Sequence, residues 1–500
     1  MTTKRFLLNC IAGVCSGLGL LHLSGCAVMR EDSAPLAQLS SDQIRLADDI
    51  KLAQEGWPEA AWWTRYHDQQ LDELIRQSLK ASPTLEVART RIAASEAQAE
   101  LVNAASGPFV GAAAEVDRQS VSENGFLGAY GKTIPMLGTN GPWYTEARVG
   151  ARASYDLDLW GKDHAKTQAA LGFVNARKAE AAQVELLLAS NVAQVYFDLQ
   201  LLNEKEGLLR EMHAVRVRIA EAHQARADHG LEPVSATQLA QIQMLELDKQ
   251  LAAAASQRHI LRESLRFLIG ADATGLRELA PVELQERQPA LPSSLGFELL
   301  AHRPDLQALR WYVQSSMDQI SAAKAAFYPS FDIRAFAGFD SLHTNELLHR
   351  SSRQLNLIPG MSLPLFDSGR LNAGLAATRS QSNALIAQYN EAVLQAVREV
   401  AQRSIDLDGL RQRSDLQTQK VHAAEFVARS AEACHQRGLI DSAISGESSL
   451  PWLAERTFAL ELHGACLHAE VALIATLGGG YEVMPKRQKI AVAKPENSAR

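Results

Sequence analysis

The chain has 500 residues, 50 Lys and Arg against 57 Asp and Glu, and a net charge of −7. This mildly acidic balance argues against a general nucleic-acid-binding protein, which presents a strongly basic face to phosphates. Such a length usually suggests two to four domains, but an internal repeat indicates one elongated body made of two similar halves.

Residues 1–25 have the order of a secretory signal peptide. Lys4 and Arg5 precede an apolar run too short to span a bilayer comfortably, followed by small residues. The sequence Leu23-Ser24-Gly25-Cys26 resembles the lipobox of bacterial lipoproteins. This resemblance implies that Cys26 is acylated and becomes the mature N-terminus, and Ala27 after it implies sorting to the outer membrane. Each buried acyl methylene then contributes about 0.8 kcal/mol to anchoring. The alternative is an ordinary signal peptide followed by a chance cysteine.

The first half begins with a polar segment over residues 26–67. We predict that its three tryptophans, Trp57, Trp62 and Trp63, pack against the body of the protein. Helical periodicity follows from about Asp68 to Ala105. Ser82-Pro83 interrupts it, which predicts two helices.

Four segments alternate between apolar and polar residues and predict two β-hairpins. They cover residues 109–118 and 146–158 in the first half and 330–340 and 353–365 in the second, with Phe336 as an interruption. Their length of about 9 to 11 residues suits transmembrane strands. A half-buried hairpin of a soluble sheet has the same local pattern.

Two long runs without proline dominate the chain. The run from Gly161 to Gly230 returns from Gly369 to Gly438, displaced by 208 positions without a gap. Each predicts one helix of about 100 Å, so the chain is an internal tandem repeat. The repeats are predicted over 68–270 and 295–480, with a connector over 271–294 and a disordered tail over 481–500. Shorter helices are predicted over 236–269 and 451–477, the second after a Ser/Gly-rich turn at 442–449.

Four strands cannot close a membrane barrel, because spanning strands need a closed ladder without free edges. The smallest closed barrels have about eight strands. The strands must therefore be shared between copies of the chain, with twelve strands from three copies or eight from two. The fold class is mostly α with a pair of transmembrane hairpins.

Four motifs stand out along the chain: Tyr155-Asp156-Leu157-Asp158-Leu159-Trp160-Gly161-Lys162, His302-Arg303-Pro304-Asp305, Ala325-Ala326-Phe327-Tyr328-Pro329-Ser330 and Leu363-Pro364-Leu365-Phe366-Asp367-Ser368-Gly369-Arg370. They resemble motifs of the TolC/OprM-type outer-membrane efflux proteins, with the NodT-like lipoprotein branch as the nearest match. The resemblance covers about Trp57 to Leu477. It implies a trimer with a twelve-stranded outer-membrane barrel and a long α-helical tunnel through the periplasm. It also implies a periplasmic adaptor and an inner-membrane transporter that supplies the energy, so the chain is expected to be a passive, gated duct.

The same resemblance places the periplasmic end at the two helix turns. It implies adaptor docking at the tips, which are Gly230, Leu231, Gly438 and Leu439. Asp441 is the candidate for an acidic group that narrows the closed gate, with Glu232 and Arg437 as possible partners; a solvated turn carboxylate is the alternative. The segment 442–449 departs from the family pattern, which leaves normal adaptor docking open and suggests a mobile tip.

The sequence contains no motif of an enzyme, cofactor site or metal site, such as HExxH, a P-loop or GxSxG. His463 and His468 flank Cys466 at a spacing poor for zinc, and Asp156 and Asp158 are interpreted as charges that face the lumen. The cysteines at 10, 15, 26, 434 and 466 imply no disulfide framework. Two alternatives to an efflux duct remain: a duct for secretion of a peptide or protein, and a lipid-anchored coiled-coil scaffold without a pore.

Overall fold

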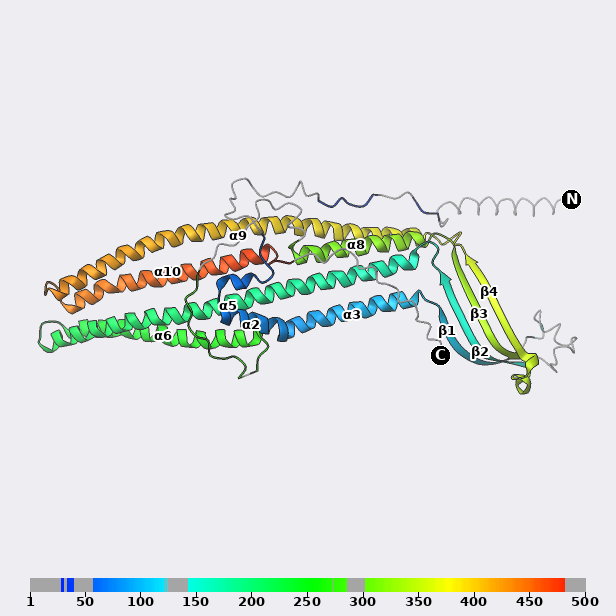
Figure 1. Cartoon of the computed structure of the whole chain (residues 1–500), viewed down its shortest axis with the longest axis horizontal. Helices are drawn as coiled ribbons and strands as arrows, with labels where there is room; N and C mark the ends of the chain where they lie inside the picture. The colour runs from blue at the N-terminus through cyan, green and yellow to red at the C-terminus, as the bar shows by residue number, and fades with distance from the viewer. Residues whose placement is uncertain are drawn as a thin grey trace, which may run out of the picture. The chain divides into compact units, whose positions relative to one another are not determined.

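A computed structural model describes residues 28–30, 34–39, 57–120, 122, 124, 143–272, 274–285 and 302–481. The predicted signal peptide, Cys26, part of the connector and the tail after Tyr481 lie outside these residues. Within them the chain is mostly helical, with one four-stranded sheet (Figure 1). The chain forms two compact units, one from Met1–Ala37, Ala93–Asn175 and Trp311–Ala387, the other from Gln38–Ile92, Ala176–Arg310 and Gln388–Arg500.

The first unit contains an antiparallel sheet whose strands follow one another in chain order. Ala112, Ala151, Ala337 and Leu355 form one row across it, and since side chains alternate along a strand, this register collects the apolar residues of all four strands on one face. The strands overlap the four predicted segments: β1 (Phe109–Ser120), β2 (Trp143–Leu157), β3 (Ser330–Ser341) and β4 (Arg353–Ser362).

The apolar face of the sheet is open to solvent in the single chain. Val110 is 71% exposed and Leu355 is 82% exposed. The opposite face carries ion pairs, including one between Arg148 Nε of β2 and Asp340 Oδ2 of β3 at 2.9 Å. An exposed apolar face with a charged reverse is typical of membrane strands with a polar lumen.

Phe336 interrupts the alternation of β3 for a steric reason. Gly150 of β2 and Gly338 of β3 lie opposite each other. The Phe336 ring lies 3.0 Å from where a Cβ of Gly150 would stand and 2.9 Å from that of Gly338. The ring therefore covers the two glycines from the polar face, as aromatic residues do when they stabilise glycine in a sheet.

The two long helices begin with capping aspartates. They are α5 (Lys162–Asp228) and α9 (Arg370–Gln436), and both contribute residues to both units. Asp158 Oδ2 accepts a hydrogen bond from the His164 backbone N–H at 2.8 Å, and Asp367 Oδ2 accepts one from the Leu371 N–H at 2.8 Å. Asp158 was predicted to lie on a strand, and this was wrong, because β2 ends at Leu157 and this carboxylate satisfies a free N–H at a helix start.

The helices of the first unit approach closely at small residues. A Cβ on Gly172 of α5 would stand 2.9 Å from the Ser315 Cβ of α8 (Pro304–Ala325). At the same contact the Ser315 hydroxyl donates to the carbonyl of Ala169 at 2.8 Å. Small side chains and satisfied hydroxyls thus let two helices touch nearly backbone to backbone.

The core of the second unit forms where α2 (Gln69–Ala81) packs against α5. Trp62, in the short helix η2 (Trp62–Tyr66), is part of this core, and Trp57 stacks on His302 with 4.5 Å between ring centroids. Trp63 also packs against this core, so the predicted packing of the three N-terminal tryptophans is confirmed. The predicted break at Ser82-Pro83 is also confirmed, since α2 ends at Ala81 and α3 (Pro83–Ala105) begins at the proline.

Two shorter helices return along the long ones, namely α6 (Val234–Leu268) beside α5 and α10 (Ser442–Thr476) beside α9. The predicted Ser/Gly-rich turn before a helix at Pro451 was wrong, because α10 begins at Ser442 and contains Pro451. Asp441 caps it by accepting from the Ile444 N–H at 2.8 Å. Gly446 lets it approach Ile219, whose Cγ1 lies 2.8 Å from where a Cβ would stand. This packing outweighs the low helix propensity of Gly and Ser.

Candidate functional site

The turn after α5 has the geometry of a glycine helix stop. Gly230 has a φ of 69°, and the Leu231 N–H donates to the Arg226 carbonyl at 2.9 Å. Together with the bond from the Gly230 N–H to the Ala227 carbonyl at 3.0 Å, this is a Schellman motif. The Leu231 side chain remains largely exposed, so the turn presents an apolar residue to solvent.

The turn after α9 repeats this geometry. Gly438 has a φ of 73°, and the Leu439 N–H donates to the Cys434 carbonyl at 2.9 Å. Leu439 is also largely exposed. The Ser445 hydroxyl of α10 donates to Glu432 Oε2 at 2.9 Å, and this hydrogen bond lowers the pKa of the Glu432 carboxyl. The four predicted tip residues thus form two matching apolar turns.

The charged residues at the turns have partners other than those predicted. Asp441 Oδ2 lies 3.1 Å from Arg226 Nη2, so this ion pair joins the end of α5 to the start of α10. Glu232 lies 2.8 Å from His223 Nδ1, within the hairpin of α5 and α6. Arg437 is exposed. The sequence analysis missed Arg226 and His223, although each lies within three turns of its helix end, where a charge can reach the following loop.

The pair of Arg226 and Asp441 ends a series of ion pairs between α5 and α10. These partly exposed pairs contribute little each, about 0–1 kcal/mol. Between them lies an apolar cluster in which Leu208, Val215 and Ile219 of α5 meet Ala443, Leu450, Leu453 and Leu460 of α10. The apolar cluster supplies most of the attraction and the charges fix the register. The other pairs are Asp198 with His468 at 2.7 Å, Lys205 with Glu461 at 2.8 Å, Glu211 with Arg456 at 3.0 Å and Arg216 with Glu447 at 2.9 Å.

Comparison with known proteins identifies the family. The family model for the outer membrane efflux protein matches residues 74–271 and 295–479. The chain belongs to this family. It is 48% identical over 477 residues to the multidrug resistance outer membrane protein MdtP of Escherichia coli (strain K12), with 95% of this chain and 98% of that protein covered. The predicted family and outer-membrane location are confirmed, and the protein is an outer-membrane efflux duct.

Solved structures show the same fold. The outer membrane protein VceC from Vibrio cholerae superposes with a TM-score of 0.73 at 27% identity, over 85% of this chain and all of that one. The CmeC outer membrane channel of Campylobacter jejuni has a TM-score of 0.78 at 18% identity, over 91% of this chain and 96% of that one. At such low identity the likeness to CmeC concerns the fold alone.

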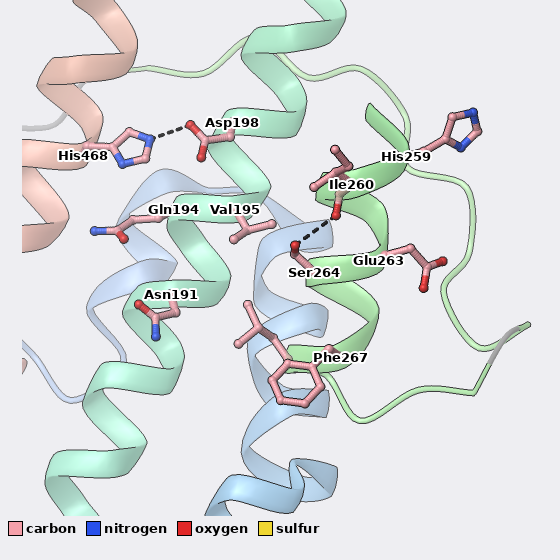
Figure 2. Close-up of a pocket in the computed structure, with 11 residues that line it drawn as sticks. Asn191, Gln194, Val195, Asp198, His259, Ile260, Glu263, Ser264, Phe267 and His468 are labelled. Atoms are coloured by element: carbon pink, nitrogen blue, oxygen red, sulfur yellow. Dashed lines mark hydrogen bonds and ion pairs between the residues drawn. The ribbon is translucent and has the colours of Figure 1, made fainter. Parts of the chain in front are cut away.

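A groove of about 750 Å³ lies between α5, α6 and α10 of this efflux protein (Figure 2). Its apolar part includes Ile260 and Phe267 of α6. Figure 2 shows Asp198 and His468 pointing toward each other, at 2.7 Å. Glu263 is paired with Arg266, whose hydrogen bond lowers the pKa of the Glu263 carboxyl. These side-chain contacts are structural, and they form no arrangement of nucleophile and base.

The described part of the chain contains no cluster of three His, Cys, Asp or Glu side chains that could hold a metal ion. Cys466 is fully buried in α10 while His468 is engaged with Asp198. Cys434 and Cys466 are both free thiols.

Proposed function

We propose that this chain forms a homotrimeric duct that exports drugs or other toxic small molecules across the periplasm and outer membrane. Three copies supply a twelve-stranded barrel, which continues into a tunnel of long helices. A periplasmic adaptor docks at the tips, and an inner-membrane transporter supplies the energy. The chain itself is passive and uses no cofactor.

The element bounds support a two-fold internal repeat. Adding 208 to the bounds of α5 gives those of α9, and the same shift converts α6 into α10. A shift of 221 converts β1 into β3. The family model also matches two segments, 74–271 and 295–479. These segments support repeats over 68–270 and 295–480, separated by the connector over 271–294.

The repeat carries the argument for assembly of several copies into a ring, because equivalent residues differ in burial. Leu208 of α5 is 4% exposed against α10, whereas its equivalent in α9, Leu416, is 61% exposed. Leu450 of α10 is 6% exposed, whereas its equivalent in α6, Ile242, is 63% exposed. The contact of α5 with α10 thus has a counterpart, α9 with α6, whose two faces are exposed in one chain. A neighbouring copy that packs its α6 on this α9 buries both faces and generates a ring.

The sheet supports the same assembly. In the described part of the chain, β1 and β4 are edge strands, and their free backbone groups cannot remain unpaired in hydrocarbon. Pairing β4 of one copy with β1 of the next satisfies them, and the exposed apolar face then meets lipid. Twelve strands from three copies agree with the resemblance to TolC/OprM-type channels.

The two turns are proposed as the adaptor-docking tips, with Leu231 and Leu439 as their exposed apolar contacts. Asp441 is proposed as the gate carboxylate, held by Arg226 in the closed state. The other two gate candidates are Glu232 at the first turn and Arg437, four residues before Asp441. Three copies of Asp441 form a ring of like charge, which selects for cations in a narrow pore. Because α10 is helical from Ser442, with Ser445 bound to Glu432, the segment 442–449 is proposed as an ordered docking surface.

The lipid anchor at Cys26 is part of the proposal, with residues 1–25 removed as a signal peptide. The name of the relative MdtP supports drugs as the exported class. The test is drug and dye susceptibility in a strain that lacks the chain, complemented with wild type or with Cys26→Ala. Restored resistance to several unrelated compounds by the wild type supports multidrug export, and failure of Cys26→Ala shows that the lipid contributes.

Unchanged susceptibility across the panel contradicts drug export and favours the alternative, a secretion duct for a peptide or protein. Comparison of exported proteins in the two strains then identifies that cargo. Absence of single-channel conductance in the purified protein contradicts any pore and supports the lipid-anchored scaffold.

A further inference from the structure

Three asparagines of α9 bind the backbone of the N-terminal segment. Asn372 is bidentate, since its Oδ1 accepts from the Arg30 N–H at 3.0 Å and its Nδ2 donates to the Val28 carbonyl at 3.0 Å. Asn383 Oδ1 accepts from the Leu36 N–H at 3.0 Å. Asn390 Oδ1 accepts from the Leu39 N–H at 2.9 Å.

The spacing of these contacts fits a helix on the side of the asparagines and an extended chain on the side of the N-terminal segment. The asparagines are 11 and 7 residues apart, close to three and two helical turns, so they lie on one face of α9. Their rise is about 16 Å and 10 Å. The bound N–H groups are 6 and 3 residues apart, which an extended chain spans in about 20 Å and 10 Å. An extended segment can therefore run along α9 in the same direction and meet each asparagine in turn.

We propose that Asn372, Asn383 and Asn390 are positioning residues that hold the N-terminal anchor segment along α9. This inference rests on the proposed lipidation of Cys26. Val28, which Asn372 binds, is only two residues after Cys26, and two residues of extended chain span at most about 7 Å. Asn372 is in the first turn of α9, which follows β4 in the chain. We call these three asparagines the asparagine track. The track therefore keeps the lipid anchor at the strand end of the long helix, where the membrane begins.

The choice of asparagine follows from what is bound. Every contact is to a backbone group, so the three asparagines recognise an extended backbone and are independent of which side chains the segment carries. An amide offers both an acceptor and a donor, which the bidentate contact at Asn372 uses. The equivalent positions in α5 hold His164, Asn175 and Ala182. The complete set of three is thus confined to the second repeat, and it gives the anchor segment a single place to bind.

Amide hydrogen exchange on the full-length, lipidated channel in detergent tests the track. Exchange at Arg30, Leu36 and Leu39 should be slower than at neighbouring exposed amides. Asn383→Leu should accelerate exchange at Leu36 by roughly two- to tenfold, the range for one lost hydrogen bond. Asn383→Asp keeps the acceptor and should leave the exchange slow. Gln381→Ala, an exposed polar site on the same helix, is the matched control and should change nothing.

Two further results separate this inference from the lipidation on which it rests. The mass of the N-terminal peptide reports acylation of Cys26 directly. Slow exchange in both the lipidated protein and Cys26→Ala supports the track independently of the lipid. Exchange at Arg30 and Leu36 as fast as in a free peptide, or an equal response to Asn383→Asp and Asn383→Leu, overturns the track even if Cys26 is acylated.

Discussion

Leu416→Asp should prevent the trimer from forming while leaving the single chain folded. A Leu side chain that becomes fully buried contributes about 1.5–3 kcal/mol. Leu416 is 61% exposed and its buried equivalent Leu208 is 4% exposed, so the assembly buries just over half of the side chain and gains roughly 1–2 kcal/mol per copy. The aspartate forfeits this gain and adds several kcal/mol for a desolvated, unpaired charge. Three interfaces multiply the loss to roughly 10 kcal/mol or more.

The assay is the mass of the purified protein in detergent, together with the heat-dependent band of unboiled protein on a denaturing gel. Phe426→Asp is the matched control, because Phe426 is exposed on the same helix and its equivalent in α5, Arg218, is also exposed. The control should remain trimeric, and circular dichroism should show equal helix content in both variants. A stable trimer for Leu416→Asp would refute the equivalence of the contacts within and between chains.

Four other substitutions test the gate, the packing of α5 and the second turn. Asp441→Asn keeps an N-cap but removes the charge, so it should lower stability by about 1 kcal/mol at most and reduce cation preference in planar bilayers; unchanged ion selectivity removes Asp441 from the gate. Gly172→Ala should destabilise the fold by about 1–3 kcal/mol through overpacking. Gly207→Ala should instead stabilise α5 by about 1 kcal/mol, because no atom lies within 4 Å of the added Cβ. Thermal unfolding monitored by circular dichroism distinguishes the two variants. Because the pKa of Glu432 is lowered in the folded chain, its contribution to stability is complete above about pH 4.3 and is lost as the pH falls through the folded pKa. Limited proteolysis of the second turn should therefore accelerate in acid. Glu432→Gln should abolish this pH dependence.

The strands show which structural features the local sequence pattern can predict. Alternation predicted all four strands, because a sheet with one apolar face enforces a period of two. It did not explain Phe336, since the reason is a pair of glycines that the register brings opposite each other from β2 and β3. Contacts between strands distant in the chain leave no periodic signal.

The start of α10 shows where local propensity fails. Gly446 and the neighbouring serines predicted a turn, yet the helix begins at Ser442. Two serine hydroxyls are satisfied within the helix, since Ser448 Oγ donates to the Ile444 carbonyl at 2.8 Å and Ser449 Oγ donates to the Gly446 carbonyl at 2.7 Å. The glycine is used for close approach to Ile219 on α5. Packing between two helices thus decides the conformation of a segment that is a poor helix former by itself.

The sequence alone predicted the long helices, the turns that end them and the family, because these depend on periodicity and on residues close together in the chain. The tertiary structure decided which charges meet. Asp441 binds Arg226, 215 positions earlier. Asn372 binds Val28 and Arg30, which lie near the N-terminus of the chain. It also revealed that Leu208 is buried where Leu416 is not. Equivalent residues such as Leu208 and Leu416 acquire different neighbours only when the chain folds. The exposure of Leu416 could therefore not be predicted from the similarity of the two long runs.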